Sequence, residues 1–225
     1  KHPINVHPSD LPRYRGGFPL EAQILAGDRK LYVSVHHTVP RIDAGGVLAR
    51  RQPLKIKRSD TMTGLLTRCL PIGAGLAAGV VTHFERLAPV PPLPVEDPVP
   101  HAWGIRRALD ASGRLVNTGV LGRLRIEWPL DTARDIARAA RAFDMIGGAM
   151  TNHGAHLYRV TAARTLENAV RGAPGEVLAR SDAGLDVQAK DAVVRLEGRF
   201  ADADGHIEVG ERFASTEPIR RLLPF

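Results

Sequence analysis

The chain has 225 residues, of which 31 are Lys or Arg, 24 are Asp or Glu and one is Cys, and its formal net charge is +7. The single cysteine, Cys69, excludes an internal disulfide framework and a Cys-rich zinc module. No stretch of about 18 apolar residues is free of charge and no secretory signal pattern is present, so we expect no transmembrane helix and a location in the reducing cytoplasm.

The first 60 residues predict short strands joined by turns. The alternation of apolar and polar residues from Ile4 to His7 is typical of a strand. Because this pattern starts at residue 4, we expect the chain to begin inside a domain. Further elements follow in chain order: a loop at 8–17, a helix at 20–26, a strand at 31–39, a turn at 43–46 and a strand at 47–56.

A helix is expected after Asp60, which suits an N-cap position. Met62, Leu65 and Cys69 recur at helical spacing and predict its buried face. Pro71 should end or kink the helix, although apolar residues continue at helical spacing as far as Leu87.

A proline-rich segment divides the chain. Residues 88–100 contain six prolines, which predict a stiff, extended linker. We therefore expect a first domain at 1–88, a linker at 89–101 and a second domain at 102–225.

The second domain is expected to begin with a helix and to continue as short strands. Thr132 and Asp135 have the spacing of a capping box, and the helix should end before Gly147. Asp204 and Gly205 are typical of a hairpin turn. Short strands are expected at 157–161, 176–178, 185–188, 193–196 and 206–209. Strands at this spacing predict a small barrel or sandwich.

The charge is not distributed as in a nucleic-acid-binding domain. The net charge is +5 over residues 1–101 and only +2 over 102–225, whereas a domain that neutralises many phosphates would be more one-sided. The densest basic run, from Arg50 to Arg58, is best explained as a solvated edge strand. Contact with phosphate or with an acidic ligand is the alternative.

The segment from Asn5 to Gly16 carries the strongest functional signal. Asn5 and His7 are two residues apart and should share one face at the end of a strand. Asp43 lies at another strand-to-turn junction. An amide, an imidazole and a carboxylate that converge there could supply an oxyanion donor, a proton-transfer group and a partner that tunes the imidazole.

This segment resembles the signature of the folate-dependent formyltransferases. That signature reads Asn-x-His-Pro-Ser-Leu-Leu-Pro, followed by Arg-Gly and later by Asp-x-Gly. The matching residues are Asn5, His7, Pro8, Ser9, Leu11, Pro12, Arg15, Gly16, Asp43 and Gly45. Asp10 departs from the pattern, which usually has Leu there. Residues 125–143 and 174–187 resemble, more weakly, the C-terminal domain of methionyl-tRNA formyltransferases.

The resemblance implies an α/β fold. It would be the C-terminal part of a Rossmann-like formyltransferase domain followed by a small, OB-like β-barrel domain. Family members have further βα units before the Asn-x-His strand, so roughly 100 residues are expected to be missing. They would build much of the sheet and part of the folate pocket.

The resemblance also implies a reaction, in which a formyl group passes from 10-formyltetrahydrofolate to a primary amine. Asn5 and His7 would stabilise the oxyanion, and Asp43 would hold the protonation state of His7 and help to remove the amine proton. Ser9, Leu11 and Pro12 would contact the folate.

Methionyl-tRNA is the first expected acceptor, and a sugar nucleotide or another small amine is the alternative. A truncated, non-catalytic remnant is a rival from another class. An RNA-binding module without chemistry is disfavoured by the charge distribution.

Weaker signals have structural explanations. The glycines from Gly73 to Gly79 are one residue too widely spaced for a dinucleotide-binding fingerprint and favour close helix packing. The histidine pairs at 36–37 and 153–156 lack the accompanying ligands of a metal site, and no metal is expected. Trp128 is expected to be a core or interface anchor, and Cys69 is expected in the core.

Overall fold

The computed structural model describes residues 3–86, 90–93, 107–109, 115–117, 119–167, 169–201 and 205–214. The chain divides into two compact units, residues 1–104 and 105–225. The predicted linker at 89–101 lies mostly outside the described residues, as does Asp204 of the predicted hairpin.

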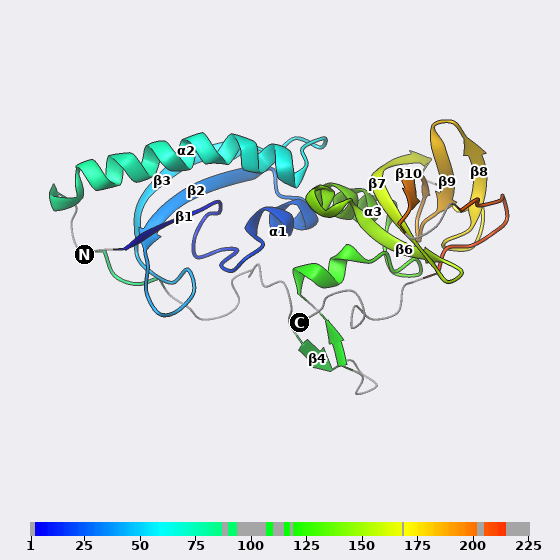
Figure 1. Ribbon diagram of the computed structural model, residues 1–225, viewed down its shortest axis with the longest axis horizontal. Helices are drawn as coiled ribbons and strands as arrows, with labels where there is room; N and C mark the ends of the chain where they lie inside the picture. Colours follow the sequence, from blue (N-terminus) through cyan, green and yellow to red (C-terminus); the bar gives the residue numbers. More distant parts are fainter. Residues whose placement is uncertain are drawn as a thin grey trace. The chain divides into compact units, whose positions relative to one another are not determined.

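The N-terminal unit is a small sheet with two helices (Figure 1). Its elements are β1 (Ile4–His7), α1 (Pro19–Ala26), β2 (Lys30–His37), β3 (Val47–Lys55), α2 (Met62–Thr82) and the 3-10 turn η1 (Phe84–Arg86). The strands lie in the order β1-β2-β3, and both pairs are antiparallel. β3 is an edge strand, which explains how it accommodates both Pro53 and its run of basic residues.

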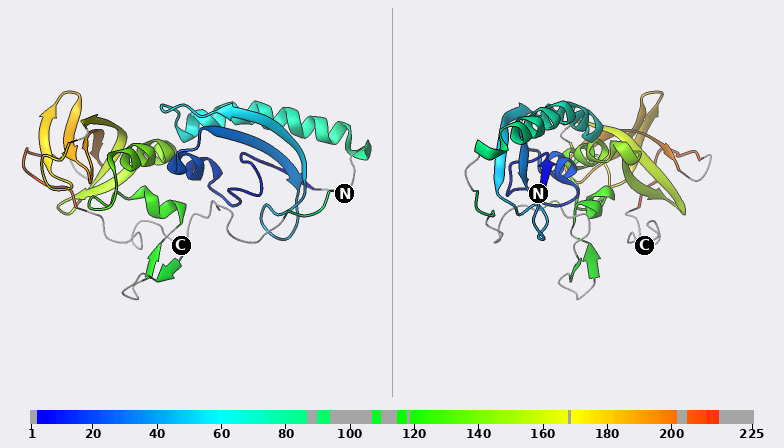
Figure 2. Two further views of the ribbon diagram at one scale, coloured as in Figure 1. Left: turned by 180° about the vertical axis from the view of Figure 1, so that it is seen from behind. Right: turned by 60° about the vertical axis from the view of Figure 1, so that its left-hand side comes forward.

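The two faces of this sheet are covered by different parts of the chain (Figures 1 and 2). α2 lies along one face and packs closely at Gly73, where an added Cβ would stand 2.7 Å from Cγ1 of Val6. The loop after β1 and α1 lie on the other face. Val33 and Val35 are buried on the α2 side, and successive strand residues alternate between the faces. Ser34, which lies between them, therefore faces the loop.

The structure corrects two details of the predicted helix. Its N-cap is Thr61, whose hydroxyl accepts a hydrogen bond from the Gly64 N–H, and not Asp60. Asp60 instead forms an ion pair with Arg68, at 2.7 Å. α2 also continues through Pro71, so of the two predicted outcomes, an end or a kink, the end is wrong. Pro71 is on the exposed side of the helix, where water can bond the carbonyl that its missing N–H leaves free.

α2 is also more apolar than we expected from the absence of long charge-free apolar stretches in the sequence. By length and composition alone it could cross a membrane, since its most apolar window has a mean hydropathy of 1.5. Cys69 and Leu65 of this helix are buried, as predicted for its inner face. α2 packs onto the sheet through one side only, and 22% of that window is buried.

The C-terminal unit contains a five-stranded antiparallel sheet in the order β6-β7-β10-β9-β8. Its strands are β6 (Ala149–His153), β7 (His156–Glu167), β8 (Val177–Ser181), β9 (Gly184–Gln188) and β10 (Val193–Phe200). Its other elements are β4 (Arg107–Leu109), β5 (Leu115–Asn117), η2 (Val120–Leu124), α3 (Ala133–Ala142) and η3 (Asp144–Ile146). Asn152 of β6 and Glu176, the residue before β8, are bridged to Ala214 and Arg212 respectively.

The core of this unit is built around Trp128, which is fully buried, as predicted. Its indole N–H donates to the hydroxyl of Thr151 at 2.8 Å, and its ring stacks on Phe213. The capping box of Thr132 and Asp135 is confirmed. The strand predicted at 206–209 is wrong, because this segment forms a turn in which Glu211 accepts from the Glu208 N–H.

Candidate functional site

The residues singled out from the sequence come together at one end of the N-terminal sheet. Asn5 and His7 are on β1, and Asp43 is in the connection between β2 and β3. Asp43 adopts a φ of +49°, a left-handed conformation that Asp tolerates better than most residues. This turn brings its carboxylate back towards β1.

The Asp43 carboxylate is the centre of the site. One oxygen, Oδ2, accepts a hydrogen bond from the Gly16 N–H at 2.9 Å and lies 3.6 Å from Nδ1 of His7. The other, Oδ1, accepts from the amide nitrogen of Asn5 at 3.3 Å and lies 3.5 Å from Nε2 of His36. Asp43 therefore joins β1, β2 and the loop after β1.

These contacts decide the charge of Asp43. Burial would raise the pKa of its carboxyl group, but the hydrogen-bonding His36, the Gly16 N–H and the neighbouring His7 outweigh burial and lower the pKa to about 2. Asp43 is consequently ionised at any physiological pH.

His7 is buried and held at both ring nitrogens. Its Nε2 lies 2.8 Å from the carbonyl oxygen of Tyr14, and because a carbonyl only accepts, Nε2 carries the hydrogen. Burial lowers the pKa of His7, against the opposing effects of Tyr14 and Asp43. His7 is thus neutral at pH 7, with Nδ1 turned towards Asp43 and able to take up a proton beside a carboxylate.

His36 belongs to this cluster and was not identified from the sequence. Its Nδ1 donates to the His37 carbonyl oxygen at 2.8 Å, and its Nε2 lies 3.3 Å from the amide nitrogen of Asn5 and 3.5 Å from Oδ1 of Asp43. The sequence places His36 in a strand, but only the register, in which it is the partner of Asn5, brings it to the site. The spacing of the histidines in the sequence does not reveal that His36 lies beside Asn5.

A cavity of about 330 Å³ opens beside the cluster. Asn5, His36 and Asp43 form its polar side, and Val39 and Ile42 form part of its apolar side. Its volume is at the lower end of the range of small-molecule sites, about 300–1,000 Å³. A reactive group held here would therefore meet an amide, an imidazole and a carboxylate together.

The residues expected to contact folate have a different position. Ser9 and Leu11 are buried, and neither they nor Pro12 line this cavity. Ser9 instead donates to the Arg13 carbonyl oxygen at 2.7 Å and shapes the loop. Their contact with folate stays a prediction.

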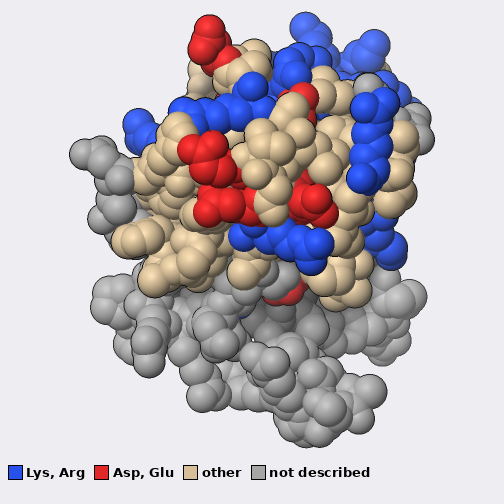
Figure 3. All heavy atoms as spheres, turned by 90° about the vertical axis from the view of Figure 1, so that its right-hand side faces the viewer, with Lys and Arg blue, Asp and Glu red and all other residues tan. Residues whose placement is uncertain are grey.

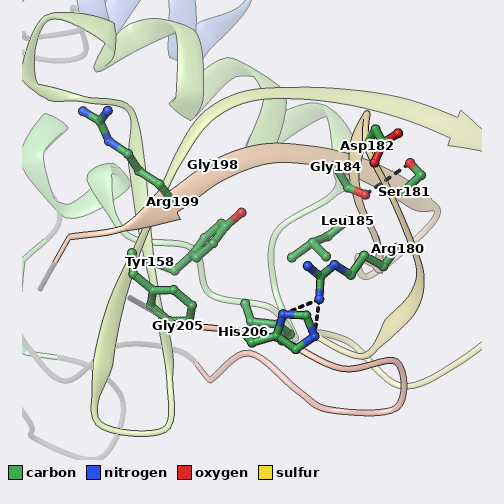
Figure 4. Close-up of a pocket in the computed structure, with 12 residues that line it drawn as sticks. Tyr158, Arg180, Ser181, Asp182, Gly184, Leu185, Gly198, Arg199, Gly205 and His206 are labelled. Carbon is green, nitrogen blue, oxygen red and sulfur yellow. Dashed lines mark hydrogen bonds between the residues drawn. The ribbon is translucent and has the colours of Figure 1, made fainter. Parts of the chain in front are cut away.

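A second cavity, of about 480 Å³, lies in the C-terminal unit (Figure 4). Arg180 extends into it and contacts the ring of His206, which also pairs with Glu208 at 2.6 Å. Tyr158 and Leu185 lie along its wall. Because Arg180 contacts His206, which in turn pairs with Glu208, we assign no chemistry to it. In the described parts of both units, no group of three or more His, Cys, Asp or Glu residues is arranged to hold a metal ion.

Two family models match this chain in succession. The formyl transferase model matches residues 1–75, and the model for the formyl transferase C-terminal domain matches residues 123–215. The chain belongs to the formyltransferase family. The first match contains Asn5, His7 and Asp43 together.

Curated relatives are named methionyl-tRNA formyltransferases. The protein of Stenotrophomonas maltophilia is 32% identical over 193 residues, which are 85% of this chain and 58% of the relative. That of Treponema pallidum is 30% identical over 195 residues, which are 86% and 56%. The chain therefore spans just over half the length of these relatives.

Solved structures confirm the formyltransferase fold. HypX from Aquifex aeolicus in complex with tetrahydrofolic acid has a TM-score of 0.56 at 22% identity, over 89% of this chain and 32% of that one. The sugar 3N-formyltransferase WlaRD has a TM-score of 0.59 at 16% identity, over 89% and 65%. The chain therefore combines the formyltransferase N-terminal and C-terminal domains in a mixed α/β architecture.

Proposed function

We propose that this protein transfers a formyl group from 10-formyltetrahydrofolate to a primary amine, with methionyl-tRNA as the first candidate acceptor. The observation that carries the proposal is the cluster of Asn5, His7 and Asp43 beside an open cavity, within a chain of the formyltransferase family. The single, buried Cys69 supports the proposal of a cytoplasmic location.

The transfer makes one bond and breaks one. The lone pair of the amine forms a bond to the formyl carbon, and the bond from that carbon to N10 of the folate breaks. One proton leaves the amine, and one is taken up by the departing nitrogen. No oxidant or reductant is needed.

The chain's own residues supply polar groups for each stage. Asn5 stabilises the negative charge that develops on the formyl oxygen, and His7 contributes by taking up a proton at Nδ1, since its Nε2–H is held by the Tyr14 carbonyl. In the described structure the Asn5 amide nitrogen lies 3.3 Å from both Oδ1 of Asp43 and Nε2 of His36, so the formyl oxygen would replace one of these contacts. The ionised Asp43 sets the protonation state of His7 and helps to remove the amine proton.

Two observations support methionyl-tRNA as the acceptor. The curated relatives carry that activity in their names. In addition, Arg159 of β7 and Arg199 of β10 are directly opposite each other in the sheet register. Arg159 donates to the Ile146 carbonyl oxygen at 2.7 Å, so a phosphate on this face of the sheet would be bound mainly by Arg199.

A small amine, such as an amino sugar nucleotide, is the second candidate acceptor. Figure 3 shows the side of the molecule that carries β8 and β9, where Asp and Glu side chains lie among Lys and Arg. Several arginines of this unit are also paired, as in the bidentate contact of Arg195 with Asp186 at 2.6 and 2.8 Å. A mixed surface of this kind favours a small acceptor over a long polyanion.

Single substitutions in the cluster test the proposal. Asn5→Ala and His7→Ala should each lower kcat by about 10²–10³-fold, the usual cost of losing one such electrostatic donor. His83→Ala is the matched control, because His83 is an exposed residue at the end of α2. Formyl transfer from 10-formyltetrahydrofolate is measured with each acceptor.

The outcomes separate the proposal from its rival. Near-normal turnover by Asn5→Ala or His7→Ala would refute the assignment of the site. A folded, unsubstituted chain that transfers formyl to neither acceptor would favour the alternative of a non-catalytic remnant.

A further inference from the structure

One row of side chains crosses the N-terminal sheet beneath the loop that follows β1. In the strand register His7 is the partner of Ser34, and Ser34 is the partner of Arg50. Register partners point to the same face of a sheet. Because α2 covers the opposite face, this row faces the loop of residues 8–17.

Each member of the row donates a hydrogen bond to a different carbonyl of this loop. His7 donates to the Tyr14 carbonyl at 2.8 Å, and Ser34 donates to that of Ser9 at 2.7 Å. Arg50 donates through Nη2 to the Leu11 carbonyl, also at 2.7 Å. The row therefore fastens the loop at three points along its length.

The contact from β3 is the charged one. Arg50 also forms an ion pair through Nη1 with Asp10 of the same loop, at 2.6 Å. The guanidinium thus holds a carboxylate and the adjacent backbone carbonyl together, and its hydrogen bond to that carbonyl is charge-assisted, which makes such a bond about twice as strong as a neutral one. Asp10 replaces the Leu that the family pattern has at this position, so the chain carries an acid where Arg50 can use it.

The other end of the loop reaches the candidate site. The Tyr14 carbonyl orients His7, and the Gly16 N–H binds Asp43 at 2.9 Å. A shift of the loop backbone would therefore move the partners of both side chains at once.

We propose that Arg50 is a positioning residue that, with Asp10 as its counter-charge, fixes the loop of residues 8–17 and thereby aligns His7 and Asp43. Its part in a reaction rests on the proposed formyl transfer. Its effect on the loop does not, and the two can be measured separately.

Hydrogen exchange of the Gly16 amide measures the loop directly. In Arg50→Met this amide should exchange faster by about tenfold or more, the change expected from a lost charge-assisted contact. Arg51→Met is the matched control, because Arg51 is the next residue of β3 and is exposed, and its substitution removes the same charge. Arg50→Lys should restore part of the protection. Equal exchange in the Arg50→Met and Arg51→Met variants would overturn the proposal.

A second variant guards against misfolding of the first. Asp10→Asn keeps the shape of the side chain and removes only its charge, and it should also accelerate exchange at Gly16. In a double-mutant cycle, Asp10→Asn should have little further effect once Arg50 is Met. Fully additive effects would show that Arg50 and Asp10 act independently and would contradict their proposed joint action on the loop.

Kinetics then test the link to catalysis. Arg50→Met should lower kcat about tenfold with a smaller change in KM, since misalignment affects the reacting groups more than binding. Arg50→Lys should recover part of the loss. If neither the variants nor the unsubstituted chain transfer formyl, the proposed function fails. The exchange results still decide whether Arg50 fixes the loop. Loss of protection at the Gly16 amide with unchanged kcat would show that Arg50 fixes the loop but does not align the reacting groups.

Discussion

A single carboxylate holds the polar contacts of the site together. Asp43 binds the Gly16 N–H and the Asn5 amide, and it faces both His7 and His36. These contacts lower its pKa from an ordinary value of 3.8 to about 2. Because the folded-state pKa is the lower one, the ionised group stabilises the fold above about pH 4, and that contribution is lost as the pH falls towards 2.

Asp43→Asn tests this linkage. Its free energy of unfolding should be lower than that of the unsubstituted chain by about 1–2 kcal/mol above pH 5, allowing for partial screening by solvent. The difference should shrink between pH 4 and pH 2, as followed by urea unfolding. Asp182→Asn, in an exposed turn, is the control. A difference that stays constant with pH would contradict the assigned role of the charge.

The residues of this site were only partly predictable. Asn5, His7 and Asp43 could be named because their order and spacing in the sequence carry the signal. His36 could not, because its position depends on pairing between β1 and β2 over a separation of 31 residues. Arg50 was assigned to a charged edge strand, with contact to phosphate or an acidic ligand as the alternative, because its contact with the loop depends on how the chain folds back over the sheet.

Among the elements, α2 shows how close packing depends on individual positions. An added Cβ at Gly73 would stand 2.7 Å from Val6 and 3.7 Å from Val33, whereas at Gly75 it would meet nothing within 4 Å. The prediction that this glycine segment serves close helix packing is therefore confirmed at Gly73 and wrong at Gly75. Hydrophobic periodicity could not separate the two positions.

Substitution of the two glycines should have opposite effects. Gly75→Ala should stabilise the protein by about 0.5–1 kcal/mol, because alanine restricts the unfolded chain and favours helix. Gly73→Ala should destabilise it by about 1–3 kcal/mol, because α2 or Val6 must move to admit a methyl group. Urea unfolding of both variants provides the comparison, and stabilisation by Gly73→Ala would refute the close contact.

The elements that the sequence predicted best are those with local signals. The capping box of Thr132 and Asp135 fixes the start of α3, and a regular alternation of residues fixes β2. The failures depend on context: α2 continues through Pro71 because that residue faces solvent, and the segment 206–209 alternates like a strand but turns at Gly210, which has a φ of +92°. Propensity alone could not decide either case.

At the scale of the whole molecule, the chain spans just over half the length of its curated relatives. β1, which carries Asn5 and His7, pairs only with β2 in the described part of the chain. The other edge of β1 therefore has main-chain groups without a neighbouring strand among the described residues, as is typical of an edge strand. Among the described residues, β1 is held by β2, by the loop of residues 8–17 and by α2, which contacts Val6.

The charge distribution of the whole chain provides a test of the acceptor's identity, because attraction to a polyanion depends on salt. The net charge of +7 is divided into +5 over residues 1–101 and +2 over 102–225, so long-range attraction to a polyanion would come mostly from the N-terminal half. If methionyl-tRNA is the acceptor, kcat/KM should fall steeply with salt, by about 10³-fold or more between 50 and 200 mM if six or more phosphates are contacted. For a small amine the change should be far smaller. The measurement compares both acceptors over that salt range with the folate donor at saturation. A flat salt response with methionyl-tRNA would show that phosphate contacts do not hold this acceptor and would favour the small amine, because an interface with tRNA cannot avoid releasing counterions.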